Sequence, residues 1–131
     1  MARGLKEHQA RQDAIAGLGR PLARRARSRC ELCESGGVPL RVVEVEPLPE
    51  EPEVDAAVLI CHRCREGMQG GPADPGEWRF LEAVAWSETP PVQVAAVRML
   101  RRFSREGQSW ASDVLDGLYL APEIDAWLGE A

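Results

Sequence analysis

The sequence predicts an α+β fold, in which a β-hairpin and a four-cysteine metal site are followed by a small helical bundle. Three observations predict it. Two Cys-x-x-Cys pairs, "CELC" at 30–33 and "CHRC" at 61–64, contain all four cysteines of the chain. Two short runs rich in β-branched residues lie between the pairs and favour strands. Beyond residue 77, apolar residues recur at helical spacing.

Length and composition indicate one soluble domain. The chain has 131 residues, of which 44% are hydrophobic and 28% charged, as in ordinary globular proteins. Its longest apolar run, 56–61, is far shorter than the about 20 residues of a membrane span. The start "MARGLKEHQARQD" has no apolar segment of the kind that secretory signals contain. We therefore expect a cytoplasmic protein with no membrane contact, in which thiols stay reduced.

Charge is distributed unevenly along the chain. Residues 1–29 hold eight Lys/Arg and two acids, whereas residues 31–55 hold eight acids and one arginine, within a net charge of −5. Such asymmetry fits an interacting basic arm. The alternative, which base rates favour, is that the arm lies against the acidic loop of its own chain or is a solvated helix.

The N-terminal half is expected to be an arm followed by a cysteine-bearing hairpin. Helix-forming residues predict helices over 4–19 and 21–28, so residues 1–28 form a basic helical arm. The alternation of Val and Glu predicts a strand over 40–48, and "AAVLI" predicts a second over 56–60. The loop between them is rich in Pro and acids, and residues 29–70 form the cysteine module.

The C-terminal part, 77–131, reads as helical and is expected to pack on that module as one compact domain. Its predicted helices cover 77–87, 90–105, 109–120 and 121–131, with Thr89 as an N-cap and Gly107 as a stop signal. The four tryptophans are interpreted as core residues. On the second of these helices one face is apolar, comprising Val92, Ala96, Met99, Leu100 and Phe103. A second stripe is basic, comprising Arg98, Arg101, Arg102 and Arg105.

The four cysteines predict a structural Zn²⁺ site. Each Cys-x-x-Cys pair supplies two thiolates from one tight turn, and two pairs complete a tetrahedron. The 27 intervening residues exceed the usual spacing, and the long hairpin tip accommodates them at small entropic cost. The predicted ligands are Cys30, Cys33, Cys61 and Cys64. A dithiol redox site is the alternative, although such sites need only one pair. His62, inside the second pair, and His8, on the arm, are interpreted as exposed.

The order of first pair, hairpin, and second pair opening a helix is that of a treble-clef or zinc-ribbon-like module. It is also similar to the frame of HNH nucleases, which place a catalytic histidine on the strand after the first pair. Here that stretch, 42–47, reads "VVEVEP" and has no histidine, so the general base for a water nucleophile is missing. Glu44 and Glu46 are the only acids there that could bind a metal.

The chain also resembles the PhnA protein family, named for alkylphosphonate utilisation, over about residues 27–128. The stretch "WSETPPVQV" is the most distinctive part. The matching residues are Arg27, Ser28, Cys30, Glu31, Leu32, Cys33, Cys61, Cys64, Trp78, Arg79, Leu81, Trp86, Ser87, Pro91, Val92, Gln93, Val94, Arg98, Leu100, Trp110, Asp113, Leu115, Asp116, Tyr119 and Leu120. The resemblance implies a zinc-binding N-terminal part of that family. Usual members add a β-rich C-terminal domain, for which this sequence has no counterpart.

Function is expected to be macromolecular interaction rather than catalysis. No carboxylate/histidine cluster or phosphate-cradling glycine loop supports phosphonate hydrolysis, and a degenerate HNH-like or phosphonate-metabolism hydrolase is kept as the alternative. A protein partner is favoured over nucleic acid because the chain is acidic overall. The candidate contact residues are Arg24, Arg25, Arg27, Arg98, Arg101, Arg102 and Arg105.

Overall fold

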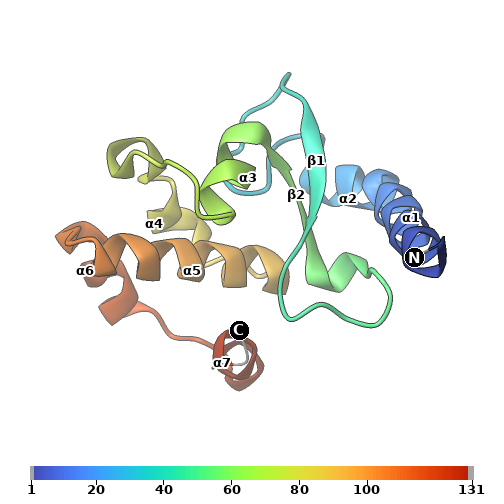
Figure 1. Ribbon diagram of the computed structural model, residues 1–131. Coiled ribbons are helices and arrows are strands. Elements are labelled where there is room, and N and C mark those ends of the chain that lie inside the picture. Colours follow the sequence, from blue (N-terminus) through green and yellow to red (C-terminus); the bar gives the residue numbers. More distant parts are fainter. Residues whose placement is uncertain (1, 130–131) are drawn as a thin grey trace.

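A computed structural model describes residues 2–129 and confirms the α+β class, with one two-stranded antiparallel sheet among helices (Figure 1). None of the helices in this part of the chain has the length and apolar character that a bilayer span requires. The elements are α1 (Ala2–Gly17), α2 (Gly19–Ala26), β1 (Leu40–Glu44), the 3-10 turn η1 (Val54–Ala56), β2 (Ala57–Cys61), α3 (His62–Met68), the 3-10 turn η2 (Pro75–Trp78), α4 (Leu81–Val84), α5 (Pro90–Arg105), α6 (Ser109–Gly117) and α7 (Pro122–Gly129).

The hairpin pairs β1 with β2 in the register Leu40↔Cys61 to Glu44↔Ala57. Every residue of β2 is buried, because one face packs on the main core and the other on α2. β1 is shorter than the predicted strand 40–48. The ladder extends one bond further, from the Val45 N–H to the Ala56 carbonyl at 2.8 Å, and then Pro47 and Pro49 interrupt any further pairing.

Helix α5 lies at the centre of the C-terminal part, with α4, α6 and α7 around it (Figure 1). The predicted apolar face of this helix is buried, and so are Val94, Ala95 and Val97. The burial is wider than one stripe because β2 and four helices, α3, α4, α6 and α7, cover α5 from different sides. The helix begins directly after Thr89 and ends before Gly107, which has a φ of +91°. Both predicted boundaries are therefore confirmed.

The predicted helix over 77–87 is wrong in its extent. The structure has the turn η2 and the one-turn helix α4 there instead. Asp74 starts η2 by accepting a hydrogen bond from the Gly76 N–H at 2.9 Å. The tight turns bury Trp78 fully against Phe103, whose ring centroid is 5.9 Å away. Trp86 is 53% exposed, so its interpretation as a core residue is also wrong.

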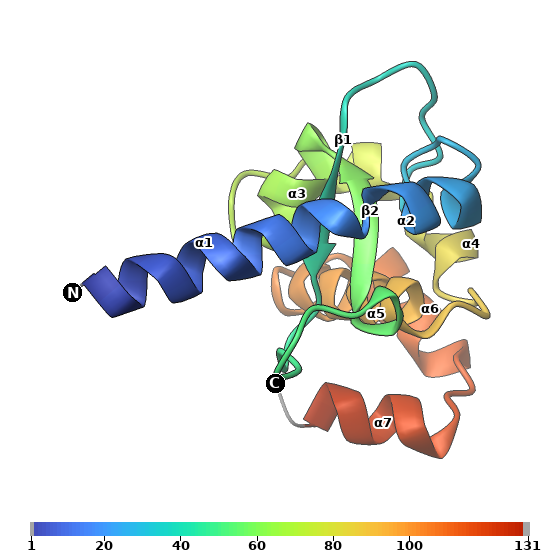
Figure 2. The ribbon, with the colours of Figure 1, turned by 90° about the vertical axis from the view of Figure 1, so that its right-hand side faces the viewer.

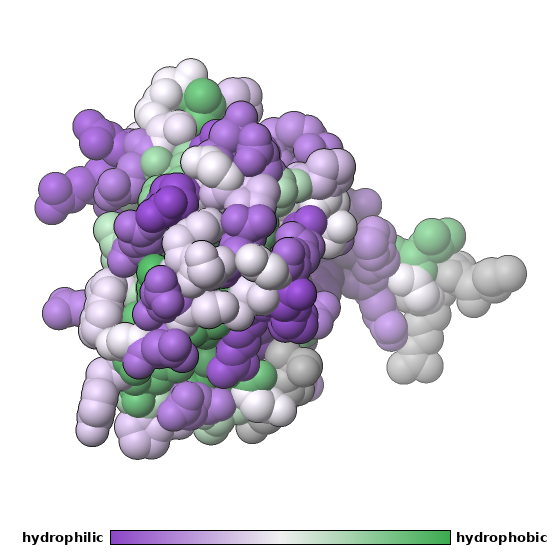
Figure 3. All heavy atoms as spheres, turned by 90° about the vertical axis from the view of Figure 1, so that its left-hand side faces the viewer, coloured by the Kyte–Doolittle hydropathy of each residue, from purple (hydrophilic) through white to green (hydrophobic). Residues whose placement is uncertain are grey.

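The arm contacts its own chain, as the favoured interpretation of the charge asymmetry predicted. The guanidinium of Arg11 in α1 pairs with Glu44 at 2.6 Å and donates to the carbonyls of Pro49 and Glu50 at 3.0 and 2.9 Å. Leu22 in α2 is fully buried on the outer face of the sheet. The first part of α1, residues 4–10, is exposed and stands away from the body, whose visible face is largely polar (Figure 3).

We predict that replacing Gly67 with alanine destabilises the fold. Gly67 is a buried residue of α3, and a Cβ there would lie 2.4 Å from Cζ2 of Trp78. Either the indole or α3 must shift, at a cost of about 1–3 kcal/mol. Urea denaturation followed by tryptophan fluorescence measures the loss. Gly17→Ala is the matched control, because nothing lies within 4 Å of its Cβ position. Equal unfolding midpoints for the two variants would contradict the prediction.

Candidate metal centre

The four cysteines converge at the junction of the hairpin with α3. The Sγ atoms all lie within 4.8 Å of one another; they belong to Cys30, Cys33, Cys61 and Cys64. The Sγ atoms of Cys33 and Cys61 are 3.7 Å apart. Four sulfurs at the usual Zn–S distance of about 2.3 Å in a tetrahedron are separated by about 3.8 Å. The donor set and its spacing thus fit a single four-coordinate metal ion.

The first pair is held in a tight turn by backbone hydrogen bonds. The Glu34 N–H donates to the Cys30 carbonyl at 2.9 Å, and the Cys30 N–H donates to the Ser35 carbonyl at 3.0 Å. Glu34 adopts a left-handed φ of 64°, which folds the chain back on itself. Leu32, between the two cysteines, is fully buried and anchors the turn in the core. The turn therefore presents both sulfurs in the same direction.

The second pair lies where a strand becomes a helix. Cys61 is the last residue of β2, and Cys64 is in the first turn of α3. The Cys61 N–H donates to Sγ of Cys30 at 3.4 Å, so the backbone of one pair contacts a sulfur of the other. Cys30 and Cys64 are almost completely inaccessible to solvent. Of the four cysteines, only Cys33 is partly exposed to solvent.

The electrostatics of the cluster favour a bound cation. The hydrogen bond from Cys64 lowers the pKa of Cys30 to about 4, with backbone N–H groups helping. The same hydrogen bond, followed by burial, raises the pKa of Cys64. Burial also raises the pKa of Cys61. Without a cation, one thiolate is therefore stabilised by a thiol that keeps its proton. Full ionisation of four adjacent sulfurs requires a positive charge among them, which a divalent metal supplies.

Arg63 adds positive charge beside the cluster. Burial lowers its pKa, but the hydrogen bond and negative charge of Cys33 outweigh this and raise the pKa overall. Its guanidinium also lies 5.8 Å from the centroid of the Phe80 ring. A shell of four thiolates around a divalent ion carries two negative charges, which this guanidinium partly balances. Sequence reasoning missed Arg63, although its place within "CHRC" was a usable signal.

A salt bridge fastens the first pair to the arm. The guanidinium of Arg25 in α2 donates to both carboxylate oxygens of Glu31 at 2.8 Å, and also to the carbonyls of Val54 and Ala57 at 2.8 Å. Glu31 in turn accepts from the Leu59 N–H at 2.9 Å. Arg25, predicted as a partner contact, is thus committed to its own chain. Glu31 was missed as a functional position, since nothing in its spacing distinguishes it from other acids.

The two histidines lie outside the cluster, as the sequence indicated. His62 is exposed, and its ring contacts Glu66 at 3.2 Å and Arg65 at 2.9 Å. His8 is exposed on α1. Glu44, one of the two acids that a hydrolase could use, accepts two hydrogen bonds from Arg11.

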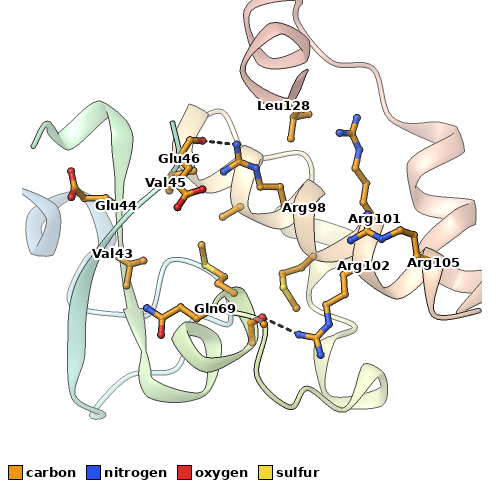
Figure 4. Close-up of a pocket in the computed structure, with 15 residues that line it drawn as sticks. Val43, Glu44, Val45, Glu46, Gln69, Arg98, Arg101, Arg102, Arg105 and Leu128 are labelled. Atoms are coloured by element: carbon orange, nitrogen blue, oxygen red, sulfur yellow. Dashed lines mark hydrogen bonds between the residues drawn. The ribbon is translucent and has the colours of Figure 1, made fainter. Parts of the chain in front are cut away.

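The remaining candidate arginines fall into two groups. Arg24 and Arg27 are exposed on or after α2, and Arg27 borders a hollow of about 480 Å³ next to Cys30. The four arginines of α5 instead line a groove of about 770 Å³ between that helix, β1 and the end of α3 (Figure 4). We call this the arginine groove; its arginines are Arg98, Arg101, Arg102 and Arg105.

Two of these arginines are partly engaged and two are free. Arg98 donates to the Glu46 carbonyl, while Arg102 donates to the Gly67 carbonyl at 2.9 Å and pairs with Glu106. Arg101 and Arg105 are exposed and have no hydrogen bond or ion pair within residues 2–129. Burial lowers the pKa of Arg98, and the like charge of Arg101 lowers it further. The groove therefore contains two arginines, Arg101 and Arg105, whose charge is not paired within the described chain.

No family model, curated protein or solved structure matches this chain. The metal centre is consequently argued from its own geometry and chemistry.

We predict that Glu31→Gln destabilises the protein by about 2–3 kcal/mol, less than the cost of breaking a fully buried pair. The amide presents an NH₂ group to Arg25 and leaves buried donors unpaired, since the Glu31 side chain is only 6% exposed. Guanidinium denaturation of the metal-loaded protein provides the measurement. Glu53→Gln, at an exposed acid on the hairpin tip, serves as the control and should change stability little. A loss below about 0.5 kcal/mol for Glu31→Gln, typical of a surface site, would show that the bridge is not structural.

Proposed function

We propose that Cys30, Cys33, Cys61 and Cys64 hold a structural Zn²⁺, and that the chain is a small metal-stabilised interaction protein. The observation that carries the first part is the convergence of four sulfurs within 4.8 Å. A four-cysteine shell has no open position, which is the usual mark of a structural rather than a catalytic site.

Zinc would contribute strongly to folding in a domain of this size. Its ligands come from two segments separated by the hairpin: the turn after α2, and the junction where β2 ends and α3 begins. When bound, the ion supplies a cross-link and neutralises thiolate charge. Structural zinc in small domains is worth on the order of 10 kcal/mol. The cysteine cluster would then hold together the hairpin on which both the arm and α5 pack.

We also propose that the module is of the treble-clef type and related to the PhnA family. The order of cysteine turn, hairpin and cysteine-bearing helix supports the first assignment. The quoted sequence resemblance supports the second. Neither assignment implies phosphonate chemistry, because a closed shell offers no site for a substrate.

The interaction role is supported by the surface rather than by the metal. The arginine groove presents two free guanidinium groups beside the hairpin, and guanidinium groups are suited to binding carboxylates and phosphates. A protein partner is preferred because the chain is acidic, with a net charge of −5.

Metal analysis of the purified full chain tests this proposal. We expect one zinc ion per chain by mass spectrometry, and loss of that ion in Cys30→Ser and Cys64→Ser. Replacement by Co²⁺ should give the absorption spectrum of a tetrahedral four-thiolate site. Ser35→Ala is the control, because it changes a neighbour of Cys33 but no ligand, and it should retain the metal.

The dithiol alternative makes the opposite prediction. Metal-free protein that keeps its helical circular dichroism and reversibly forms a disulfide would contradict the structural zinc site. Unfolding on chelator treatment, reversed by Zn²⁺, would support it.

A further inference from the structure

The two outer edges of the sheet differ in whether their backbone N–H and C=O groups are hydrogen-bonded to the rest of the described chain. The Val45 N–H donates to the Ala56 carbonyl across the hairpin. In an antiparallel pair, every second residue of each strand directs its N–H and C=O towards the other strand, and the residues between direct theirs outwards. The outward-pointing groups of β2 consequently belong to residues 57, 59 and 61. All three positions are engaged: Arg25 binds the Ala57 carbonyl, Glu31 binds both backbone groups of Leu59, and Cys30 accepts from the Cys61 N–H. The cysteine turn and α2 thus close this edge.

The edge of β1 is open. Its outward-pointing groups belong to Leu40, Val42 and Glu44 by the same alternation. Within residues 2–129, none of these groups has a hydrogen bond to another part of the chain. At Glu46 the carbonyl is already bound by Arg98 and by Trp127, so the open stretch ends there. An unpaired edge of this kind is a template for another strand.

The space beside this edge is bounded on two sides. The arginine groove runs along it on the side of α5, with Arg98 directed towards Glu46 (Figure 4). Val43, Met68 and Met99 form part of its apolar lining. On the other side, the first half of α1 extends past β1, away from β2 (Figure 2). A strand placed on β1 would therefore have α1 next to one face and the arginines next to the other.

We propose that the open edge of β1 binds an extended acidic segment of a partner protein by strand addition. The segment's backbone would pair with Val42 and Glu44, and its acidic side chains would reach Arg101 and Arg105. This inference names the kind of partner for the interaction role proposed above and rests on that role. It uses a known recognition mode, in which main-chain bonds give affinity and alternate side chains give specificity.

The geometry favours a polypeptide over nucleic acid. A nucleic-acid backbone cannot pair with the N–H and C=O groups of a strand edge, and it is negatively charged along its whole length. The groove instead has one basic wall and an opposite wall with Glu44 and Glu46. A strand meets these walls separately, because its side chains alternate between two faces. If every second residue of the bound segment is acidic, its carboxylates all lie on the face next to the arginines and none lies on the face next to the glutamates.

The test uses a fluorescein-labelled octapeptide of alternating Glu and Val and the zinc-loaded full chain. Fluorescence anisotropy should show saturable binding. Arg101→Glu combined with Arg105→Glu should weaken it at least tenfold. The control pair, Arg20→Glu with Arg29→Glu, reverses the same charge at exposed positions on and after α2 and should bind as the unchanged chain does. A Lys-Val octapeptide should not bind.

Hydrogen exchange locates the contact without relying on a variant that must fold. Peptide binding should slow exchange at the amides of Val42 and Glu44 and leave those of α2 unchanged. Val42→Pro removes an outward N–H without breaking a hydrogen bond to β2, and should weaken binding at least tenfold in protein whose circular dichroism matches that of the unchanged chain.

Zinc content is measured on every sample, so the two proposals fail separately. Absence of zinc from the unchanged chain contradicts the metal site. A zinc-loaded chain that ignores the peptide, or that binds it without protecting Val42 and Glu44, overturns strand addition alone. Preferential, salt-sensitive binding of a 12-nucleotide single strand, lost in the Arg101/Arg105 variant, would overturn it in favour of nucleic acid.

Discussion

The convergence of four thiols is the constraint on which the remaining structure depends. It joins two segments that lie far apart in the sequence: the turn at 30–33, and the stretch 61–64 where β2 passes directly into α3. A two-stranded hairpin is marginal by itself. Here β2 is buried on both faces and carries one of the cysteines at its end. The arm and α5 then pack on opposite faces of an already ordered sheet.

The same junction explains why the sheet has one closed and one open edge. The cysteine turn lies beside β2, where Arg25, Glu31 and Cys30 occupy the outward backbone groups. No equivalent segment lies beside β1 in the described part of the chain. Charge follows this asymmetry in part: Arg25 of the arm pairs with Glu31 at the closed side, whereas Arg101 and Arg105, near the open side, have no ion pair within residues 2–129. The contacts that stabilise the fold thus lie at the edge of β2, and the proposed binding site lies at the edge of β1.

Sequence reasoning succeeded where a local rule applies. The strands, the boundaries of α5 and the grouping of the cysteines each follow from spacing, alternation or a cap residue. It was wrong over 77–87, where helix-forming residues are divided into η2 and α4. The burial of Trp78 decides that segment, because two tight turns place it against Phe103. The prediction that Trp86 is a core residue is wrong for the same reason. Its residue type indicates burial, but the path of the chain leaves its side chain half exposed.

The sequence by itself determined the α+β class, the grouping of the four cysteines and a helix with an arginine stripe, because each depends on short-range periodicity or on the small number of cysteines. Only the tertiary structure decided which charges are free. Arg25 and Arg101 both belong to basic stretches of the sequence. Yet Arg25 is bound to Glu31 and two carbonyls, while Arg101 has no hydrogen bond or ion pair within residues 2–129. That distinction arises from which segments meet in space, and pairing between distant residues leaves no periodic signal in a single sequence.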